Sequence, residues 1–515
     1  MGFSLHLLLL FVHSAICFSG QTFPYMTSDV QEVSGRFFDY IVVGGGTAGC
    51  PLAATLSEKF SVLLVERGGS PYEDPFIMDT KHYGLSLLQI DEYTSVAQSF
   101  VSEDGISNLR GRVLGGSSAL NGGFYSRASE GFIEKVGWDN EGVRDAYEWV
   151  ESRIISKPDL TPWSYVAAFS FLEAGIFPYN GFSLEHIPGT KIGGSLFDEQ
   201  GKRCLSADLL QAGNPTNITV LLNATVNNVI FHTNCTGGEK IARGIRFIKS
   251  DGSSNRTYEA YLNQQPGNSS TLGDVILAAG ALGSPQILLL SGIGPQEHLN
   301  NFKIPLVLDL KEVGEGMQDN PGIAVLADSK PQNRTPEPPK VAGITDDFQI
   351  IIEAGILPVS LNATVIPIAA KIAFPESVGK LELNNTDPRA NPSVAFNYLS
   401  SDKDRAQCVK LGQLLERVVR SESIAFFLGS NEHQNKMMST EDELRKHCKN
   451  NVRTFYHYHG GCTKGSVVDE NYRVHNVEGL KVIDGSTFLE SPGTNPMATL
   501  LMLGRYQGVK ILEGR

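Results

Sequence analysis

Three glycines and one acidic residue near the start of the chain have the spacing of a nucleotide-binding turn. Gly44, Gly46 and Gly49 form a G-x-G-x-x-G pattern, and Glu66 follows 20 residues after Gly46. In such a turn the first glycine permits a tight bend, the second lets the backbone approach a pyrophosphate, and the third lets a helix pack closely on a strand. A carboxylate at the later position can accept hydrogen bonds from a ribose diol and disfavours the 2′-phosphate of NADP. The pattern therefore predicts binding of the ADP half of a dinucleotide.

The elements that must position these residues are recognisable within residues 36–67. The run DYIVV is apolar and β-branched, as expected of a strand buried on both faces. A helix should follow the glycines, and SVLLVE should form a second strand that ends at Glu66. The pyrophosphate would then lie at the helix N-terminus, where free N–H groups and the helix dipole favour anions. The turn alone does not distinguish NAD from FAD.

The length and composition are typical of a globular protein. At one domain per ~150 residues, a chain of 515 residues would form about three units or two intertwined ones. It is 41% hydrophobic and 19% charged, which argues against a disordered or fibrous protein. A net charge of −13 opposes binding to a phosphate backbone, and the sequence has no basic cluster and no Cys/His zinc spacing. Nucleic acid and metal ions are therefore not expected partners.

Residues 1–20 are expected to be a signal peptide. Their apolar run, Leu5 to Cys17, is too short to cross a bilayer and fits the hydrophobic part of a secretion signal, although no Lys or Arg precedes it. No other stretch is long and apolar enough for stable membrane insertion. We therefore expect a secreted, extracellular glycoprotein. Eight N-x-S/T sequons support this expectation: Asn217, Asn223, Asn234, Asn255, Asn268, Asn333, Asn362 and Asn384.

Six cysteines remain after removal of the signal peptide, and they allow 15 full pairings. Cys50 lies on the first predicted helix and is expected to be a buried free thiol. Cys408 and Cys448 flank a helical stretch and are the best candidates for a disulfide. The alternative that all six thiols are unpaired remains open.

Later segments alternate between helical and extended patterns. Residues 111–129 are rich in glycine, which indicates backbone that passes close to something flat. Amphipathic helices are predicted over residues 143–155 and 163–174, and strands within residues 216–231 and 240–248. Residues 273–294 predict a strand, a tight turn and a helix.

The last third of the chain predicts a second sheet. Residues 321–345 are rich in Pro, Gln, Asn and Lys and indicate a surface excursion or a boundary. Extended segments within residues 346–385 precede a helix from Ser401 to Val419, a pattern that favours an antiparallel sheet backed by helices. The chain closes with a strand, a turn and a helix, so its first and last segments are expected to share a domain.

Four motifs, found in the same order, make the chain resemble the glucose-methanol-choline (GMC) family of FAD oxidoreductases over nearly its whole length. Within that family it most resembles the plant branch of HOTHEAD-like proteins and (R)-mandelonitrile lyases. The motifs are VGGGTAG with Glu66, GRVLGGSSALNGGFYSRA at 111–128, GALGSPQILLLSGIGP at 280–295, and HYHGG with IDGSTF and NPMAT near the end.

The resemblance implies an α/β plus α+β fold with two interleaved domains. A discontinuous Rossmann-like FAD-binding domain would comprise residues 36–135, 200–320 and 450–515. Residues 136–199 and 321–449 would form the substrate-binding domain, built on an antiparallel sheet backed by helices.

The resemblance also implies FAD, held without a covalent bond, and assigns residues to it. Thr47 and Ala48 would lie at the pyrophosphate, and Glu66 and Arg67 at the adenosine ribose. The backbone of Val226 would contact adenine, although a plain core valine is an equal alternative. The flavin and its phosphates would be lined by a further set: Val113, Ser117, Asn121, Tyr456, Asp484, Gly485, Pro496 and Met497.

Catalysis is assigned by the same resemblance to His457 and Asn495. A histidine with a pKa near 6.5 can accept the hydroxyl proton of an alcohol as its hydride leaves for the flavin. Asn495 would hold the hydroxyl and the imidazole in register and, because Pro496 follows it, would also cap the final helix. Tyr458 and His459 are expected to pack around the ring.

Two departures from the mandelonitrile lyases favour alcohol oxidation. Tyr456 stands where those relatives carry Trp, and Asn495 where they carry His. We therefore expect an FAD-dependent alcohol oxidase or dehydrogenase acting on a small aromatic or long-chain alcohol, with O₂ as one candidate acceptor. A hydroxynitrile lyase acting on a cyanohydrin with non-redox FAD, and a non-catalytic flavoprotein, are the alternatives. The substrate, acceptor and oligomeric state stay open.

Overall fold

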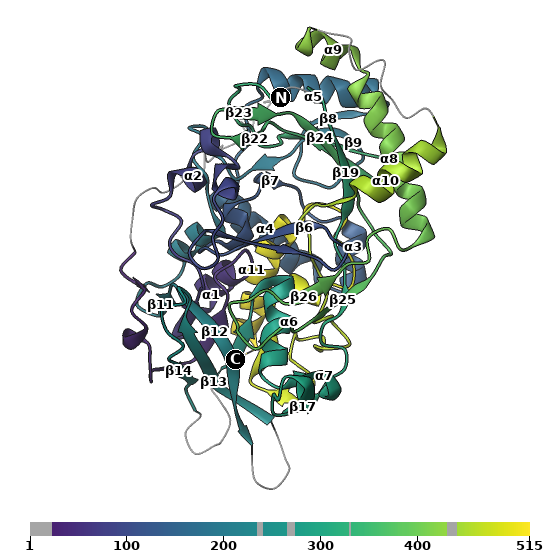
Figure 1. The fold of residues 1–515 in the computed structure, drawn as a ribbon. Helices are drawn as coiled ribbons and strands as arrows, with labels where there is room; N and C mark the ends of the chain where they lie inside the picture. The colour runs from purple at the N-terminus through teal and green to yellow at the C-terminus, as the bar shows by residue number, and fades with distance from the viewer. Residues whose placement is uncertain (1–22, 234–239, 265–272, 329–330, 430–439, 515) are drawn as a thin grey trace, which may run out of the picture.

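The two largest hydrophobic cores of the described residues belong to two units, which lie toward the bottom and the top of Figure 1. The computed structural model describes residues 23–233, 240–264, 273–328, 331–429 and 440–514. The larger core surrounds a parallel sheet and the helices on it, and the smaller one lies between a second sheet and helices α5 and α8. The predicted signal peptide and two sequons, Asn234 and Asn268, lie outside the described residues.

A six-stranded sheet in which every pairing is parallel carries the glycine turn. The strands β3 and β4 are fully buried, because their apolar runs face helices on one side and other strands on the other. Its strands come from distant parts of the chain, so the first and last segments share one sheet. In spatial order they are β1 (Met26–Thr27), β11 (Ile218–Leu221), β4 (Val62–Val65), β3 (Tyr40–Val43), β15 (Val275–Leu277) and β29 (Leu480–Val482).

Helix α1 (Gly49–Leu56) follows the glycine turn, and the C-terminal helix α11 (Met497–Glu513) packs directly against it. This close approach depends on glycines of α11. A Cβ at Gly504 would lie 2.1 Å from the carbonyl oxygen of Ala48. The contact places the beginning of α11 beside the cavity described below.

A five-stranded sheet and helix α6 (Gly280–Leu290) complete the larger unit, toward the bottom of Figure 1. Strand β12 runs directly on from β11 after a two-residue link, so one continuous segment serves two sheets. The strands of this second sheet are β12 (Ala224–Thr233), β13 (Lys240–Lys249), β14 (Tyr258–Leu262) and β2 (Phe37–Phe38), with β28 (Val477–Glu478) beside β13.

A seven-stranded sheet forms the other unit, toward the top of Figure 1. Its pairings are antiparallel except for β8 with β9. Helices α5 (Pro162–Glu173) and α8 (Asp402–Val419) pack on it. In spatial order the strands are β27 (Arg453–Thr454), β19 (Pro321–Leu326), β24 (Pro367–Ile372), β21 (Ile350–Ala354), β20 (Val341–Ile344), β9 (Gly189–Ile192) and β8 (Tyr179–Phe182).

Three expectations need correction or refinement. Residues 321–345 are not merely a surface excursion, because β19 and β20 lie within this sheet despite the polar stretch between them. Helix α4 (Asn140–Ile154) packs against α11, so it belongs to the larger core rather than to the substrate unit. Strands β25 (Gly379–Glu382) and β26 (Ser393–Ala395) also contribute to the larger core.

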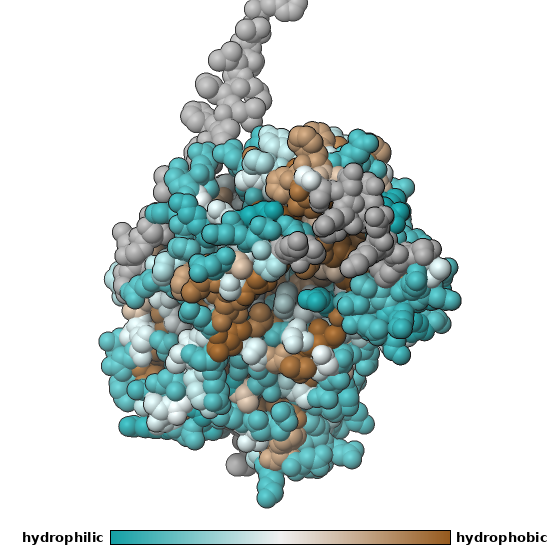
Figure 2. All heavy atoms as spheres, turned by 45° about the horizontal axis from the view of Figure 1, so that its top comes forward, coloured by the Kyte–Doolittle hydropathy of each residue, from teal (hydrophilic) through white to brown (hydrophobic). Residues whose placement is uncertain are grey.

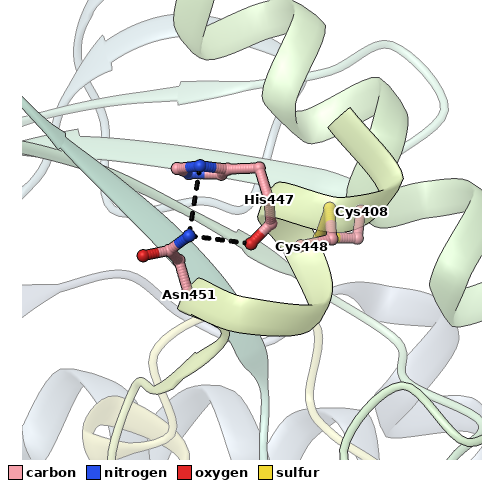
Figure 3. The surroundings of a disulfide bond; sticks show 4 residues. All are labelled: Cys408, His447, Cys448 and Asn451. Carbon is pink, nitrogen blue, oxygen red and sulfur yellow. Dashed lines mark hydrogen bonds between the residues drawn. A yellow bond between two sulfur atoms is a disulfide. The ribbon is translucent and has the colours of Figure 1, made fainter. Parts of the chain in front are cut away.

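The predicted disulfide between Cys408 and Cys448 is confirmed (Figure 3). It joins α8 to α10 (Glu441–Asn451), with a Cα–Cα distance of 6.1 Å. Cys50 is a buried free thiol, as predicted. No helix within the described ranges combines the length and apolarity needed to cross a bilayer.

Replacing Cys408 and Cys448 together by serine should lower the free energy of unfolding by about 3–4 kcal/mol, because the bond closes a loop of 40 residues. Guanidinium unfolding under non-reducing conditions measures this. Cys462→Ala removes a buried free thiol without opening a loop and serves as the control. A double variant as stable as the parent protein would contradict the prediction.

Candidate active site

A cavity of about 560 Å³ lies where the two units meet and brings together residues from both. Most of the residues predicted from the sequence line it, although they are separated by more than 400 positions in the chain. They are Gly44, Gly46, Thr47, Ala48, Glu66, Arg67, Ser117, Asn121, Val226, Tyr456, His457, Asp484, Gly485, Asn495, Pro496 and Met497.

Two predicted residues pack behind the cavity instead. A Cβ at Gly49 would lie 1.9 Å from the carbonyl oxygen of Gly44, so this glycine lets the helix sit on the turn. Val113 is fully buried, and its backbone pairs with Gly69. Both residues support the cavity wall without reaching its surface.

The carboxylate of Glu66 is held at one end of the cavity by backbone N–H groups. Its Oε2 accepts from Gly45 N at 2.9 Å, and its Oε1 accepts from Gly68 N at 2.8 Å. Burial raises the pKa of Glu66, while these N–H groups oppose that shift. Each carboxylate oxygen retains a second lone pair, which can accept a ligand hydroxyl.

Arg110 is a cavity residue that the sequence reasoning missed. Its Nε donates to Gln98 Oε1 at 3.2 Å, the same oxygen that Arg67 Nη1 contacts at 2.5 Å. Its Nη2 is buried and has no hydrogen-bond partner in the described part of the chain. Burial lowers the pKa of Arg110 well below its usual value. A buried donor without a partner is costly, so this end of the cavity suits a polar ligand.

Three helical N-termini lie at the cavity wall. They are those of α1 after Ala48, of the 3-10 helix η4 (Gly116–Ala119), and of α11 after Pro496. In each case no side chain among the described residues caps the helix. Such termini favour negative charge, so they make the cavity suitable for an anionic ligand.

His457 is fixed by its neighbours on one side of the ring. Its Nδ1 lies 3.1 Å from Asn320 Oδ1 and 3.1 Å from Lys371 Nζ, while its backbone N–H donates to Asp319 Oδ1 at 2.8 Å. Since His457 lines the cavity, Nε2 is the ring nitrogen left for a bound molecule. Burial, and after it the charge of Lys371, lower the pKa of His457 well below its usual value. The ring is therefore neutral at neutral pH.

Asp319 holds the loop that carries His457. Its Oδ2 accepts from Thr454 Oγ1 at 2.5 Å and from Tyr398 Oη at 2.6 Å, and burial raises its pKa to about 6. Tyr456 has a φ of 61°, a conformation that costs a side-chain-bearing residue on the order of 1 kcal/mol or more. The hydrogen bonds around it stabilise this bend, which directs the next residue, His457, into the cavity.

Asn495 does not cap the final helix, contrary to the prediction. Helix α11 begins one residue later, after Pro496, and Asn495 Nδ2 donates to Glu353 Oε1 at 2.8 Å. Asn495 Oδ1 is buried and accepts no hydrogen bond from the described residues. Glu353 is partly buried and faces the cavity from β21, and desolvation of its carboxylate raises its pKa. The amide oxygen of Asn495 is therefore available to a ligand.

The other histidine of the HYHGG motif has a different environment. His459 is 2% exposed, its Nδ1 lies 3.0 Å from the carbonyl oxygen of His457, and it is not among the residues that line the cavity. The structure thus brings His457, rather than His459, together with Asn495.

The end of the cavity next to His457 has largely apolar and aromatic walls. Its wall residues include Tyr83, Leu87, Phe124, Leu357 and Phe455. Figure 2 shows apolar residues gathered in the middle of one face of the molecule, between hydrophilic margins. Within the described ranges, no group of three or more His, Cys, Asp or Glu side chains could hold a metal ion.

Comparisons with known proteins identify the family. Two GMC oxidoreductase family models match residues 189–322 and 375–504. An (R)-mandelonitrile lyase-like protein of Arabidopsis thaliana is 41% identical, covering 95% of this chain and 92% of its own. Protein HOTHEAD of Arabidopsis thaliana is 40% identical, covering 98% of this chain and 92% of its own. The sinalpyl alcohol oxidase Nec3 of Nesocodon mauritianus is also 40% identical, covering 93% of this chain and 89% of its own. The chain belongs to the GMC oxidoreductase family.

Solved structures share the fold at low sequence identity. Pyridoxine 4-oxidase from Mesorbium loti is 21% identical with a TM-score of 0.78, covering 92% of this chain and 99% of its own. A fungal aryl-alcohol oxidase is 20% identical with a TM-score of 0.68, covering 93% and 99%. At this identity the likeness establishes the fold alone.

Family membership implies FAD, and the cavity fits it. The glycine turn and the helical N-termini suit a pyrophosphate, and Glu66 suits a ribose. Arg110 Nη2 and Asn495 Oδ1, which have no hydrogen-bond partner among the described residues, suit polar groups of a ligand. Asp484 makes a structural contribution at this wall. Its oxygens accept from Gly280 N, Ser284 Oγ and the backbone and hydroxyl of Ser486, so its carboxylate ties α6 to β29.

Gly46→Ala and Gly49→Ala should separate cofactor binding from folding. A Cβ at Gly46 meets nothing closer than 3.8 Å and would project into the cavity, so this variant should fold but bind FAD at least about tenfold more weakly. Gly49→Ala should destabilise the fold by about 1–3 kcal/mol or more because its Cβ would clash with Gly44. Flavin titration and thermal unfolding measure the two effects. Unchanged FAD affinity in Gly46→Ala would show that the pyrophosphate lies elsewhere.

Proposed function

We propose that this protein is a secreted, FAD-dependent oxidoreductase that oxidises the CH–OH group of an alcohol, with His457 as the base. The observation that carries the proposal is the fixed imidazole of His457. Its Nδ1 contacts Asn320, and the residue lines the same cavity as Asn495, whose amide oxygen has no hydrogen-bond partner among the described residues.

His457 is suited to accept the hydroxyl proton of the substrate at Nε2. An unprotonated imidazole is required for this step, and burial keeps the ring neutral by lowering its pKa. Removal of the proton makes the carbon a better hydride donor. Bound FAD would supply the acceptor of that hydride.

Asn495 is suited to orient the alcohol. Glu353 holds one N–H of the amide, which leaves the second N–H and the buried Oδ1 for the substrate. The uncapped start of α11, immediately after Asn495 and Pro496, presents backbone N–H groups to the same region. These groups favour negative charge where it develops during the reaction.

The substrate class follows from the walls near His457. Aromatic and aliphatic side chains such as Tyr83, Phe124 and Phe455 would exclude water and pack on an apolar body. We therefore propose an aromatic or long-chain primary or secondary alcohol, in line with the alcohol oxidase name of one relative.

The proposal extends to the attachment of FAD, the bounds of its domain and secretion. We propose that FAD is bound without a covalent link and that acid precipitation would release it. Residues 36–135, 200–320 and 450–515 are proposed as its domain, with α4 added because it packs on α11. Secretion is supported by five sequons whose asparagines are exposed: Asn223, Asn255, Asn333, Asn362 and Asn384.

A hydroxynitrile lyase is the second candidate, because a lyase-like relative is 41% identical. In that reaction His457 would remove the hydroxyl proton of a cyanohydrin, and cyanide would depart without electron transfer. Asn495 in place of a second histidine favours oxidation.

Anaerobic mixing of the holoprotein with a panel of alcohols distinguishes these functions. Bleaching of the flavin absorbance by an aromatic or long-chain alcohol is the expected result. Release of cyanide from mandelonitrile without bleaching would establish the lyase instead. A holoprotein that does neither would be a non-catalytic flavoprotein.

His457→Ala should lower the rate of flavin bleaching by about 10²–10⁴-fold while FAD remains bound, because the proton acceptor is lost. His459→Ala is the matched control. It removes a buried imidazole of the same loop that does not line the cavity, so its rate should stay within about tenfold of the parent rate. If His457→Ala kept the full rate, the assigned base would be wrong.

A further inference from the structure

Lys371 occupies an unusual position for a lysine. It is fully buried on β24, and the only hydrogen-bond contact of its Nζ within the described residues is His457 Nδ1, at 3.1 Å. No carboxylate in the described part of the chain lies within ion-pair distance of its Nζ. By contrast Lys191, the other fully buried lysine on this sheet, contacts Ser126 Oγ and the carbonyl oxygens of Ser183 and Glu185.

The pairing of β21 with β24 places Lys371 next to Glu353, which lines the cavity. In the antiparallel pair of β21 and β24, Glu353 lies opposite Ala369 and Ile351 opposite Lys371. Glu353 and Lys371 are therefore diagonal neighbours on one sheet face. One contacts Asn495 and the other His457, so the same strand pair supports both proposed catalytic side chains.

Asn320 and Lys371 both contact Nδ1 of His457, but an amide oxygen requires a protonated Nδ1 and an ammonium group requires an unprotonated one. Asn320 Nδ2 donates to the carbonyl oxygens of Ile372 and Ala373 at 2.8 and 2.9 Å, so its Oδ1 must face the ring as an acceptor. An ammonium group on Lys371 can only donate. Nδ1 cannot donate to Asn320 and accept from Lys371 at the same time.

We propose that Lys371 is a positioning residue whose protonation selects which ring nitrogen of His457 carries the proton. With neutral Lys371, Nδ1–H donates to Asn320 and Nε2 presents a lone pair to the substrate. When one proton binds to Lys371, the ammonium donates to Nδ1, and the ring proton resides on Nε2. This inference rests on the proposed function, because it describes how the proposed base is made ready.

The two states would support opposite chemistry. The Nε2 lone pair accepts the hydroxyl proton of an alcohol, as oxidation requires. The Nε2–H form instead donates to a carbonyl or alkoxide oxygen and cannot act as the base. Oxidation should therefore be restricted to the state in which Lys371 is neutral.

The surroundings allow this change near neutral pH. Burial lowers the pKa of Lys371 to about 7, opposed by the charges of Glu353 and Asp319. The charge of Lys371 also acts on three histidines, and burial lowers the pKa of each of them. They are His457, His459 and His186. Lys371 is protonated below its pKa, so the active form is lost as the pH falls through about 7.

Substitutions at Lys371 should act in opposite directions. In the parent holoenzyme, kcat/KM for an oxidised alcohol should fall about tenfold for each pH unit below the pKa of Lys371. Lys371→Met should remove this limb, so that its rate at pH 6 equals its rate at pH 8. Lys371→Arg carries a guanidinium that stays protonated, so it should keep the Nε2–H form and stay slow throughout. Lys191→Met is the control and should keep the parent pH profile.

The tautomer itself provides a readout that needs no substrate. The protein is labelled with ¹⁵N in the imidazole, and the His457 signals are identified by their loss in His457→Gln. As the pH falls through about 7, these signals should show the ring proton moving from Nδ1 to Nε2. Lys371→Met should show Nδ1–H at every pH. One tautomer throughout in the parent protein, or an unchanged transition in Lys371→Met, would overturn the proposal. If no alcohol bleaches the flavin, the proposed oxidation fails, while these spectra still decide the role of Lys371.

Discussion

The amide side chain of Asn320 connects the two parts of the molecule on which the site depends. It is completely buried just before β19, where it donates to the end of β24 and accepts at the ring of His457. Its neighbour Asp319 holds the backbone of the same histidine. An amide that satisfies two carbonyl groups in this way cannot rotate without leaving them unpaired, at a cost of about 1–3 kcal/mol each. The orientation of the imidazole is therefore determined by the end of β24, an interior strand of the seven-stranded sheet.

Burial has a second consequence at this site. Lys371 and Asp319 are buried and Glu353 is partly buried, and desolvation shifts the pKa of each in the direction that favours its neutral form. Electrostatic interactions are strong in such surroundings because little water screens them. Small changes in the charge of one group thus affect its neighbours, which is a suitable setting for a proton-transfer reaction.

The cavity lies between the two units, and each unit contributes a different kind of residue to it. The larger unit supplies the glycine turn, Glu66 and the uncapped helices, which suit a nucleotide cofactor. The seven-stranded sheet supplies Glu353, Lys371 and part of the apolar wall. Relatives named as lyases and as an alcohol oxidase share about 40% identity with this chain.

Local patterns in the sequence determined the glycine turn, its flanking strands and the positions of α5 and α8, because these depend on short-range periodicity and backbone sterics. The same reasoning identified His457 and Asn495 through motifs that resemble a known family. It missed Asn320, Glu353, Lys371 and Arg110, and it wrongly made Asn495 a helix cap. Those residues carry no local signal, since a lone polar residue in a strand is ordinarily a solvated one. The register of β21 against β24 places Glu353 and Lys371 at the site. Asn320 comes from just before the start of β19, and Arg110 from β6 (Ser107–Gly111). These positions, like the start of α11, depend on contacts between segments far apart in the chain, which local sequence patterns do not encode.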